Sequence, residues 1–362
     1  MTPRRAAAVF LALLPGALLP GIAPAQTFVP DAARLASPFL PAAPAVAGPA
    51  ALCQPVPDPV RNLEGVAYYA DAAFSRADPD RLRADEEAAK PLRDWLRAVQ
   101  HDLARYRRGE AGAVACVLET LDAWARTGAL LGGFNLQGSY HRKWTLAGAA
   151  LAFVAVAEAP GLDPLKRGRT ARWLREVALA VRPRYDRISA ALINDTRNNH
   201  AAWAGLAIAA AGVAAGDRAL LDWGIARLRA QLVQVDERGA LPQELARGAM
   251  ALHYHLFALE PIAALSRLAA ANGIAMSDDE TAALTRLRRF VLAAAEDPSR
   301  MAAVAGIAQD DPFLRGRTPL VQAAGLEVLQ SADPDPAAEP ALAPHRPYRS
   351  AWLGGDVTGW WR

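Results

Sequence analysis

The sequence predicts an all-helical protein whose architecture is an α/α barrel, an incomplete toroid of helical hairpins. Apolar residues recur at three- and four-residue spacing in successive segments from Asp85 onward. Gly or Pro separates these segments, for example at Pro160, Gly216 and Gly273. The alternation that marks strands is nearly absent, so each helix must bury one face against its neighbours. A compact bundle that is not a ring is the alternative.

The N-terminus has the layout of a secretory signal peptide. Two arginines precede a short apolar run, and small residues before Gln26 offer a cleavage site after Ala25. The apolar run is shorter than a typical membrane-spanning helix. We therefore expect residues 1–25 to be removed. The mature chain, 26–362, is expected to be one periplasmic domain with no membrane contact.

Residues 26–62 are rich in Pro and Ala without a regular period, which predicts an extended arm over the surface. Cys53 lies in this arm and Cys116 in a helical segment, and the chain has two cysteines in all. An oxidising compartment favours a disulfide between them over two buried thiols. The arm is therefore expected to be tethered.

The charge of the chain bears on which classes of binding partner are expected. The formal net charge is only +3, and no basic stripe with interleaved aromatic residues appears, so a nucleic-acid partner is not expected. The basic residues are almost all Arg, which a GC-rich genome would explain. Guanidinium groups also bind carboxylates through two parallel hydrogen bonds. We expect a monomer.

Each expected helix follows from its apolar period. The segment over 199–215 is apolar nearly all round, which predicts an inner helix, and the segment over 217–235 is amphipathic, which predicts an outer one. The full set of expected helices covers 86–107, 110–130, 142–158, 165–183, 199–215, 217–235, 250–272 and 279–295.

Three polar side chains stand at the start of the inner helix. Asn198, Asn199 and His200 lead directly into an apolar run that includes Trp203. An Asn at this place can simply cap the helix by accepting from free backbone N–H groups. The alternative is that the three side chains bind a ligand.

A second polar group follows about 50 residues later. Arg247 and Tyr254 are seven residues apart, so they share a face if the segment is helical. His253 and His255 then point elsewhere. A metal site that these two form with His200 is an alternative that the two-residue spacing disfavours.

Together these stretches resemble the alginate lyases of polysaccharide lyase family 5, the periplasmic mannuronate lyases. The resemblance is carried by NNHAAW at 198–203, DERGALPQE at 236–244, and an Arg seven residues before the Tyr-His pair at 254–255. HRKWTLAGAALAF at 141–153 and WLGGDVT at 352–358 are similar to further family segments. The two cysteines stand where family members carry cysteines.

The resemblance implies an α/α-barrel lyase that cleaves a 1,4-linked uronate polymer by β-elimination, with no metal or other cofactor. Tyr254 matches the family's catalytic Tyr, Asn199 and His200 its Asn-His pair, and Arg247 its Arg. These residues imply an anionic uronate polysaccharide as partner. The residues expected to bind this substrate are Asn198, Gln137, Tyr140, Arg142, Lys143, Trp203, Tyr68 and Tyr69.

Two regions depart from the family pattern. The expected lid, about 64–82, does not match the usual basic lid, so Tyr68, Tyr69 and Arg76 compete for the lid role. Trp352 occupies a place where an Arg is common. These departures concern the choice of substrate more than the reaction.

The chemistry explains why these residue types are needed. Removing the C5 proton of a uronate builds charge on the neighbouring carboxylate, which Asn199, His200 and Arg247 would neutralise. Tyr254 would take that proton and return one to O4. A free Tyr has a pKa near ~10, and Arg247 nearby would favour its ionised form. A single Tyr suits mannuronate-type polymers, in which both groups leave from the same side.

Three other functions remain open. One is a lyase for another uronate polymer, such as polyglucuronate. The second is a glycoside hydrolase that uses Asp195 and Glu244 as acid and base. The third is a non-catalytic periplasmic protein for polysaccharide binding or export.

Overall fold

The computed structural model describes residues 34–44, 52–187 and 195–361. The signal peptide expected at 1–25 and parts of the arm lie outside these ranges. Within them, no helix is long and apolar enough to cross a membrane.

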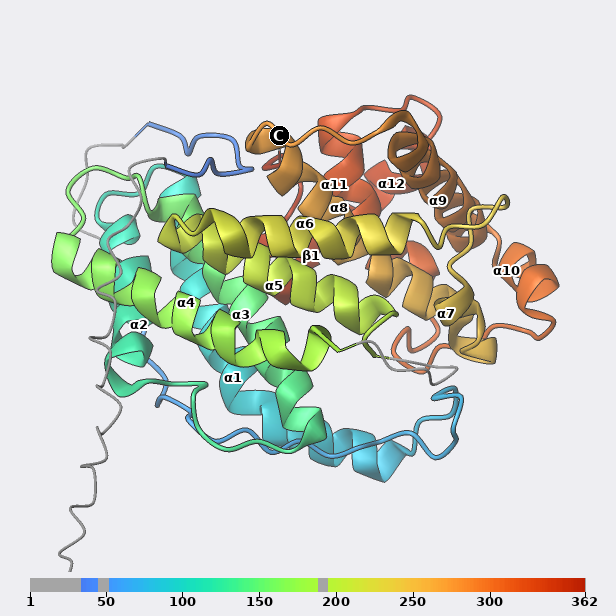
Figure 1. Ribbon diagram of the computed structural model, residues 1–362, viewed down its shortest axis with the longest axis horizontal. Coiled ribbons are helices and arrows are strands. Elements are labelled where there is room, and N and C mark those ends of the chain that lie inside the picture. The colour runs from blue at the N-terminus through green and yellow to red at the C-terminus, as the bar shows by residue number, and fades with distance from the viewer. Residues whose placement is uncertain (1–33, 45–51, 188–194, 362) are drawn as a thin grey trace, which may run out of the picture. The chain divides into compact units, whose positions relative to one another are not determined.

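The described chain is mainly helical and has almost no strand, which confirms the all-helical fold class of the α/α-barrel type (Figure 1). The long helices are α1 (Pro79–Arg107), α2 (Ala113–Thr127), α3 (Leu136–Val156), α4 (Pro164–Tyr185), α5 (Asn199–Ala215), α6 (Arg218–Leu232), α8 (Ala251–Ala271) and α9 (Asp278–Glu296). The short helices are α7 (Pro242–Leu245), α10 (Pro298–Ala305), α11 (Ala324–Ala332) and α12 (Glu339–Leu342), with 3-10 turns η1 (Gly248–Met250), η2 (Pro319–Gln322), η3 (Ala343–His345) and η4 (Ala351–Leu353). Strands β1 (Arg349–Ser350) and β2 (Gly355–Asp356) pair antiparallel.

Helix caps explain where the expected bounds were wrong. The helix expected over 86–107 begins at Pro79 because the Asp78 side chain accepts from two backbone N–H groups of the first turn. The helix expected over 142–158 begins at Leu136 because Asn135 caps it in the same way. Both starts are polar, so the apolar period does not reach them. The inner helix α5 agrees with its expected bounds at both ends.

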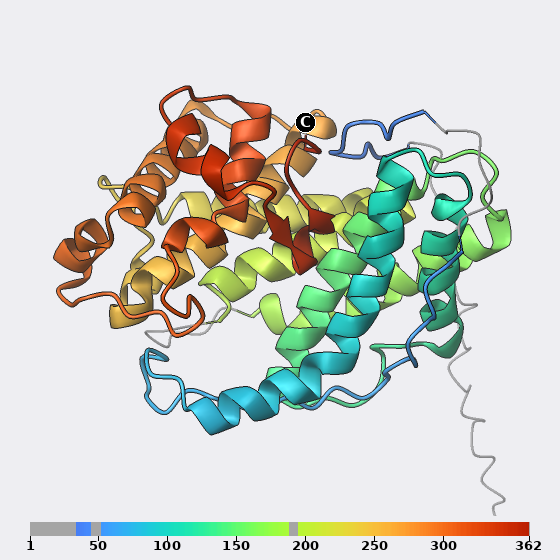
Figure 2. The same cartoon turned by 180° about the vertical axis from the view of Figure 1, so that it is seen from behind.

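Helix α5 occupies the inner position that its sequence predicts, packing against α3, α4, α6 and α8 (Figures 1 and 2). Its contact with α6 is unusually close. A Cβ added at Gly224 would lie 2.4 Å from the Gly205 carbonyl oxygen and 2.6 Å from Ala209 Cβ. Glycine at this crossing lets the two backbones approach closely, which sets the position of α5 against α6.

The C-terminal segment closes one side of the core. Strand β2 contacts α1, and η4 contacts α3, which places this segment among the blue-green helices in Figure 2. A Cβ at Gly148 in α3 would lie 2.4 Å from the Ala351 carbonyl oxygen. This close approach brings Trp352 to stack on Trp144, with ring centroids 5.1 Å apart.

Cys53 and Cys116 are joined by a disulfide that links the arm to α2, with a sequence separation of 63 and Cα atoms 5.0 Å apart. Two hydrogen bonds hold the same part of the arm. The Gln54 backbone N–H donates to Asp102 in α1, and the Trp124 indole donates to the Pro57 carbonyl. The arm is therefore fixed to α1 and α2 at several points.

We expect the denatured, unreduced protein to contain no free thiol. For a loop of this length, the bridge is expected to raise the free energy of unfolding by about 4 kcal/mol in the chain-entropy model. Thiol titration before and after reduction tests the bond. Denaturant unfolding of the Cys53→Ser, Cys116→Ser double variant measures its contribution to the free energy of unfolding. Two free thiols before reduction would contradict the assignment.

Candidate active site

Asn198 and Asn199, neighbours in sequence, have different environments. Asn198 is the N-cap of α5, and its side-chain oxygen accepts from the His200 backbone N–H at 2.9 Å. It is 2 % exposed, so the capping interpretation accounts for it without a role in substrate binding. Asn199 is fully buried in the first turn.

Asn199 is held by Glu244 of α7. The Asn199 backbone N–H donates to Glu244 Oε1 at 2.6 Å, and its amide nitrogen lies 3.1 Å from Oε2. Its amide oxygen, Oδ1, is buried without a hydrogen-bond partner. A buried polar atom without a partner is costly in free energy, so the amide is a candidate to bind a group that the structure does not contain.

Burial raises the pKa of the Glu244 carboxyl, and the Arg247 charge and the Asn199 hydrogen bonds oppose this. Glu244 is fully buried and binds the backbone and side chain of Asn199. Glu244 therefore holds the first turn of α5 in place. This arrangement does not favour Glu244 as the acid or base of a hydrolase.

His200 lies in a stack of aromatic rings. Its imidazole stacks on Tyr140 with centroids 4.1 Å apart, and on Trp144 at 5.7 Å. Its Nδ1 lies 2.9 Å from the Lys143 ammonium. Burial lowers the pKa of His200 well below its usual value, and the charges of Lys143 and Arg247 add to the effect. The imidazole is therefore neutral at pH 7, so it can act as an N–H donor but supplies no positive charge.

Tyr140 and Asp195 support this stack from the side. The Tyr140 hydroxyl donates to Asp195 Oδ2 at 3.1 Å, and Arg184 forms an ion pair with the same carboxylate. Asp195 is thus committed to two partners, which leaves it poorly suited to act as a hydrolase carboxylate. Tyr140 remains partly exposed and stays a candidate for substrate contact.

Arg247 and Tyr254 are in contact, although they do not share a helix face as expected. Arg247 precedes η1 and is not part of the helix that carries Tyr254, so the helical spacing argument was wrong for it. The guanidinium carbon nevertheless lies 3.6 Å from the centroid of the Tyr254 ring. The turn before α8 folds the Arg side chain back over the Tyr.

The expected lid covers Tyr254. Residues 68–78 form a tight hairpin, with backbone bonds from Ala70 to Arg76 and from Asp78 to Tyr68. The Tyr69 hydroxyl forms a hydrogen bond with the Tyr254 hydroxyl. At the tip, the Phe74 carbonyl accepts from Arg247 at 3.4 Å. The structure thus brings Tyr69, rather than Arg76, onto the proposed base.

The Tyr254 hydroxyl is protonated in this arrangement. Burial raises its pKa above the usual value, and the Arg247 charge opposes the shift without cancelling it. The expectation that Arg247 favours the phenolate has the right sign. However, burial under the lid is the larger effect in this structure.

Gln137 and His141 hold the start of the lid. Both side chains bind Asp85, at 2.9 and 2.8 Å, and the same carboxylate accepts from the Val66 backbone N–H. The start of the lid is thereby attached to α1 and α3. Gln137 is partly exposed, and its contact with the substrate stays a prediction.

Three more expected substrate-binding residues are buried. Trp203 and Lys143 are fully buried, and Arg142 is 3 % exposed, with its guanidinium over the Phe134 ring. A fully buried indole cannot offer its face to a sugar, so Trp203 is corrected to a core residue, and Lys143 lies behind His200. Tyr68 is partly exposed and packs on Tyr69, so it remains a candidate.

His253 and His255 do not join His200. Both His255 ring nitrogens bind backbone, because Nε2 accepts from Leu241 and Nδ1 donates to Ala251. Burial lowers the pKa of His255 to about 4, which keeps it neutral. His253 forms a pair with Asp311 at 2.9 Å. No group of three His, Cys, Asp or Glu among the described residues is arranged to bind a metal.

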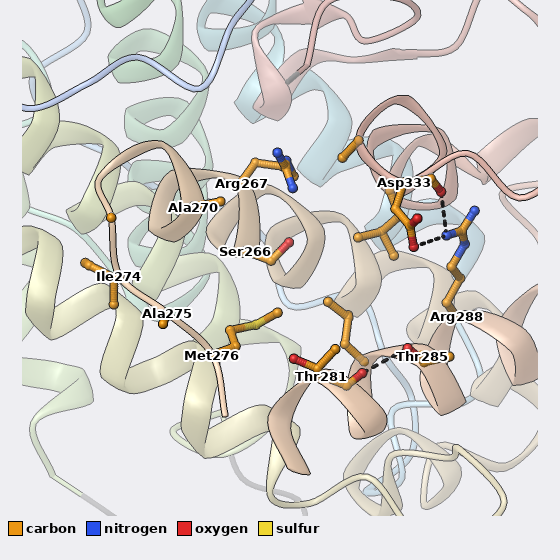
Figure 3. A pocket seen from close by; sticks show the side chains of 14 residues that line it. Ser266, Arg267, Ala270, Ile274, Ala275, Met276, Thr281, Thr285, Arg288 and Asp333 are labelled. Atoms are coloured by element: carbon orange, nitrogen blue, oxygen red, sulfur yellow. Dashed lines mark hydrogen bonds and ion pairs between the residues drawn. The ribbon is translucent and has the colours of Figure 1, made fainter. Parts of the chain in front are cut away.

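A cavity of about 440 Å³ lies elsewhere, between the end of α8, α9 and α11. Figure 3 shows that two of its charged residues, Arg288 and Asp333, point toward each other and are joined by dashed lines. Neither the Asn199–His200 pair nor Tyr254 lines it. We therefore place the candidate site at the converging polar groups rather than at this cavity.

Sequence reasoning missed two features of the site. It took Lys143 for a substrate ligand, although its position seven residues inside α3 already put it deep in an apolar helix. It gave no role to Trp352, whose ring contacts Trp144 and Phe257 beside His200. The Trp352 contacts join segments that are distant in sequence, so no local pattern could have shown them.

Comparison with known proteins gives a consistent result. The family model described as alginate lyase matches residues 66–301. A polysaccharide lyase of Stenotrophomonas maltophilia (strain K279a) is 32% identical over 325 residues, which cover 88% of this chain and 94% of that protein. An alginate lyase of Azotobacter vinelandii is 34% identical over 323 residues, covering 86% of this chain and 84% of the relative.

The fold also matches a solved structure. The crystal structure of an alginate lyase from a Sphingomonas species superimposes with a TM-score of 0.69 over 84% of each chain, at 24% identity. The same lyase has been crystallised in complex with a tetrasaccharide.

Proposed function

Because this chain belongs to the alginate lyase family, we propose that it is a polysaccharide lyase that cleaves a mannuronate-type uronate polymer, with Tyr254 as base and acid. The observation that carries the proposal is the contact between Arg247 and the Tyr254 ring at 3.6 Å. It puts a positive charge over the ring of the residue whose hydroxyl the reaction needs. The proposed place of action is the periplasm, after removal of residues 1–25.

The first requirement is to stabilise the charge that develops on the C6 carboxylate. Arg247 supplies the positive charge. His200 is neutral and supplies an N–H donor, and the Asn199 amide is held in place by Glu244. Donors fixed before the reaction need no reorganisation as the charge develops, which makes such contacts a large catalytic term.

The second requirement is proton transfer. The C5–H bond breaks, its electrons form the C4–C5 double bond, the C4–O4 bond breaks, and O4 receives a proton. The protonated Tyr254 of this structure is the form that can donate to O4. To act first as base, it must lose its proton, and Arg247 is the contacting group that favours the phenolate. Substrate must also displace the Tyr69 hydroxyl.

The stereochemistry favours one class of polymer. In mannuronate, H5 and O4 leave from the same face, so one hydroxyl can serve both steps. In guluronate they leave from opposite faces, and a second proton-transfer group is required. His200 would have to be that group, but its Nδ1 is already bound to Lys143. Polyglucuronate, which shares the mannuronate geometry at these positions, is the second candidate substrate.

We expect the mature protein to release unsaturated ends from polymannuronate or polyglucuronate faster than from polyguluronate. The new double bond is conjugated with the carboxylate, so cleavage is read as near-ultraviolet absorbance. Hyaluronan completes the panel. New reducing ends without absorbance would indicate a hydrolase, binding without any cleavage would indicate a binding protein, and preference for polyguluronate would contradict the single-Tyr mechanism.

A further inference from the structure

We propose that Lys143 is a positioning residue that holds His200 in the tautomer with its proton on Nε2 and so presents that N–H to the substrate. The proposal deepens the proposed function and rests on it for the role of His200. Lys143 comes from the middle of α3 and His200 from the first turn of α5. Their nitrogens, Nζ and Nδ1, are 2.9 Å apart. Lys143 is fully buried, so its ammonium cannot reach the substrate itself.

The direction of this hydrogen bond follows from the surroundings of Lys143. Burial lowers the pKa of Lys143 well below its usual value, and the Asp195 charge opposes this shift. In its charged form, Lys143 has three donors and no acceptor, so it donates to Nδ1. Among the described residues, no carboxylate lies within ion-pair distance of Nζ. Instead, the rings of Tyr140, Trp144 and Tyr185 surround it, at 4.1, 4.7 and 5.6 Å from their centroids. Aromatic faces stabilise a cation in place of a counter-ion.

The same rings fix the plane of the imidazole. Tyr140 stacks on His200 with an interplanar angle of 23°, and Trp144 does so at 29°. With the plane held by stacking and Nδ1 bound to Lys143, rotation of the ring would break both contacts. His200 remains partly exposed, and Nε2 has no partner among the described residues. The free N–H is therefore Nε2–H, on the part of the ring left for a ligand.

The charged groups around the pair are consistent with a neutral imidazole. Lys143, Arg184 and Arg247 are cations near His200, and each lowers its pKa. Asp195 is an anion near Lys143, and it is bound to Arg184 and to the Tyr140 hydroxyl. A second proton on His200 would therefore be opposed by three positive charges.

The tautomer can be measured without substrate. We expect ¹⁵N-histidine spectra of the full mature chain at pH 7 to show the His200 proton on Nε2. The resonance is assigned by its loss in His200→Gln. In Lys143→Met, which keeps the length of the side chain but has no donor, we expect a mixture of both tautomers. In Lys143→Gln, whose amide can still donate to Nδ1, the Nε2–H form should persist.

The kinetic expectation follows from the same geometry. At metal sites, losing a group that orients a ligating His costs about 10–100-fold in affinity or activity, and we use the same range for a group that orients His200. We expect a loss of that size in kcat for Lys143→Met, with KM nearly unchanged, and substantial recovery in Lys143→Gln. Lys90→Met is the matched control, because Lys90 is exposed and forms an ion pair within its own helix; its kcat should equal that of the parent.

Several results would overturn the proposal. A proton on Nδ1 or a doubly protonated ring in the parent protein would do so, even if Lys143→Met failed to fold. So would a folded Lys143→Met with full kcat, or a Lys143→Gln as impaired as Lys143→Met. If the parent shows the Nε2–H tautomer but cleaves no uronate polymer, the proposed function fails and the positioning by Lys143 stands.

Discussion

Tyr254→Phe is expected to abolish turnover while leaving the fold and polymer binding nearly intact. The ring is kept, so its packing against Phe257 and the Arg247 guanidinium is preserved. Only the hydroxyl is removed, and with it both proton transfers. Acid–base catalysis by a positioned group contributes about 10²–10⁴-fold, and we expect the upper end of that range because one hydroxyl serves both steps.

Tyr69→Phe is the matched control for this variant. Both substitutions remove the same hydrogen bond between the two hydroxyls, so their losses in unfolding free energy should be similar, about 1 kcal/mol. Only Tyr254→Phe removes the proton-transfer group, so Tyr69→Phe should retain measurable turnover. Rates, melting curves and polymer binding are compared for both variants. An active Tyr254→Phe enzyme would end the proposed mechanism.

Arg247→Met is expected to have the next largest effect. Removing one preorganised group that stabilises transition-state charge typically lowers kcat by about 10²–10³-fold. Arg247→Lys keeps the charge but loses the planar group that lies over the Tyr254 ring. We therefore expect Lys at this position to recover only part of the rate. Equal kcat in the parent and Arg247→Met would remove Arg247 from the site.

The pH profile of Arg247→Met provides a second readout. The Arg247 charge lowers the pKa of Tyr254 in the native protein, against the effect of burial. Without that charge, the pKa rises further and the phenolate forms at higher pH. The limb of the kcat/KM profile that rises with Tyr254 ionisation should therefore move to higher pH. A shift to lower pH would contradict the proposed role of Tyr254 as base.

The helices could be predicted from sequence because their determinants are local. Apolar periodicity and cap residues act within about four positions along the chain, so α5 was located from Asn199 to Ala215. The starts of α1 and α3 were missed because polar first turns, capped by Asp78 and Asn135, carry no apolar period. The all-helical fold class needed no tertiary information.

The candidate site could be predicted only in part from the sequence. Asn199, His200, Arg247 and Tyr254 could be proposed as site residues because they stand in short sequence motifs that resemble those of a known family. The seven-residue spacing argument reached the right pair for the wrong reason, since Arg247 lies before the helix. The roles of Lys143 and Trp203 were misjudged because amino-acid type alone does not reveal whether a side chain faces a cleft or the core.

What the sequence by itself determined is the set of helices, the order of the polar motifs and the chemistry that those residue types can perform. The tertiary structure alone decided which side chains meet. Lys143 contacts His200 across 57 residues, Glu244 contacts Asn199 across 45, and Tyr69 contacts Tyr254 across 185. The packing of whole helices fixes such contacts. The apolar area that each helix buries contributes more to its position than any single polar pair does.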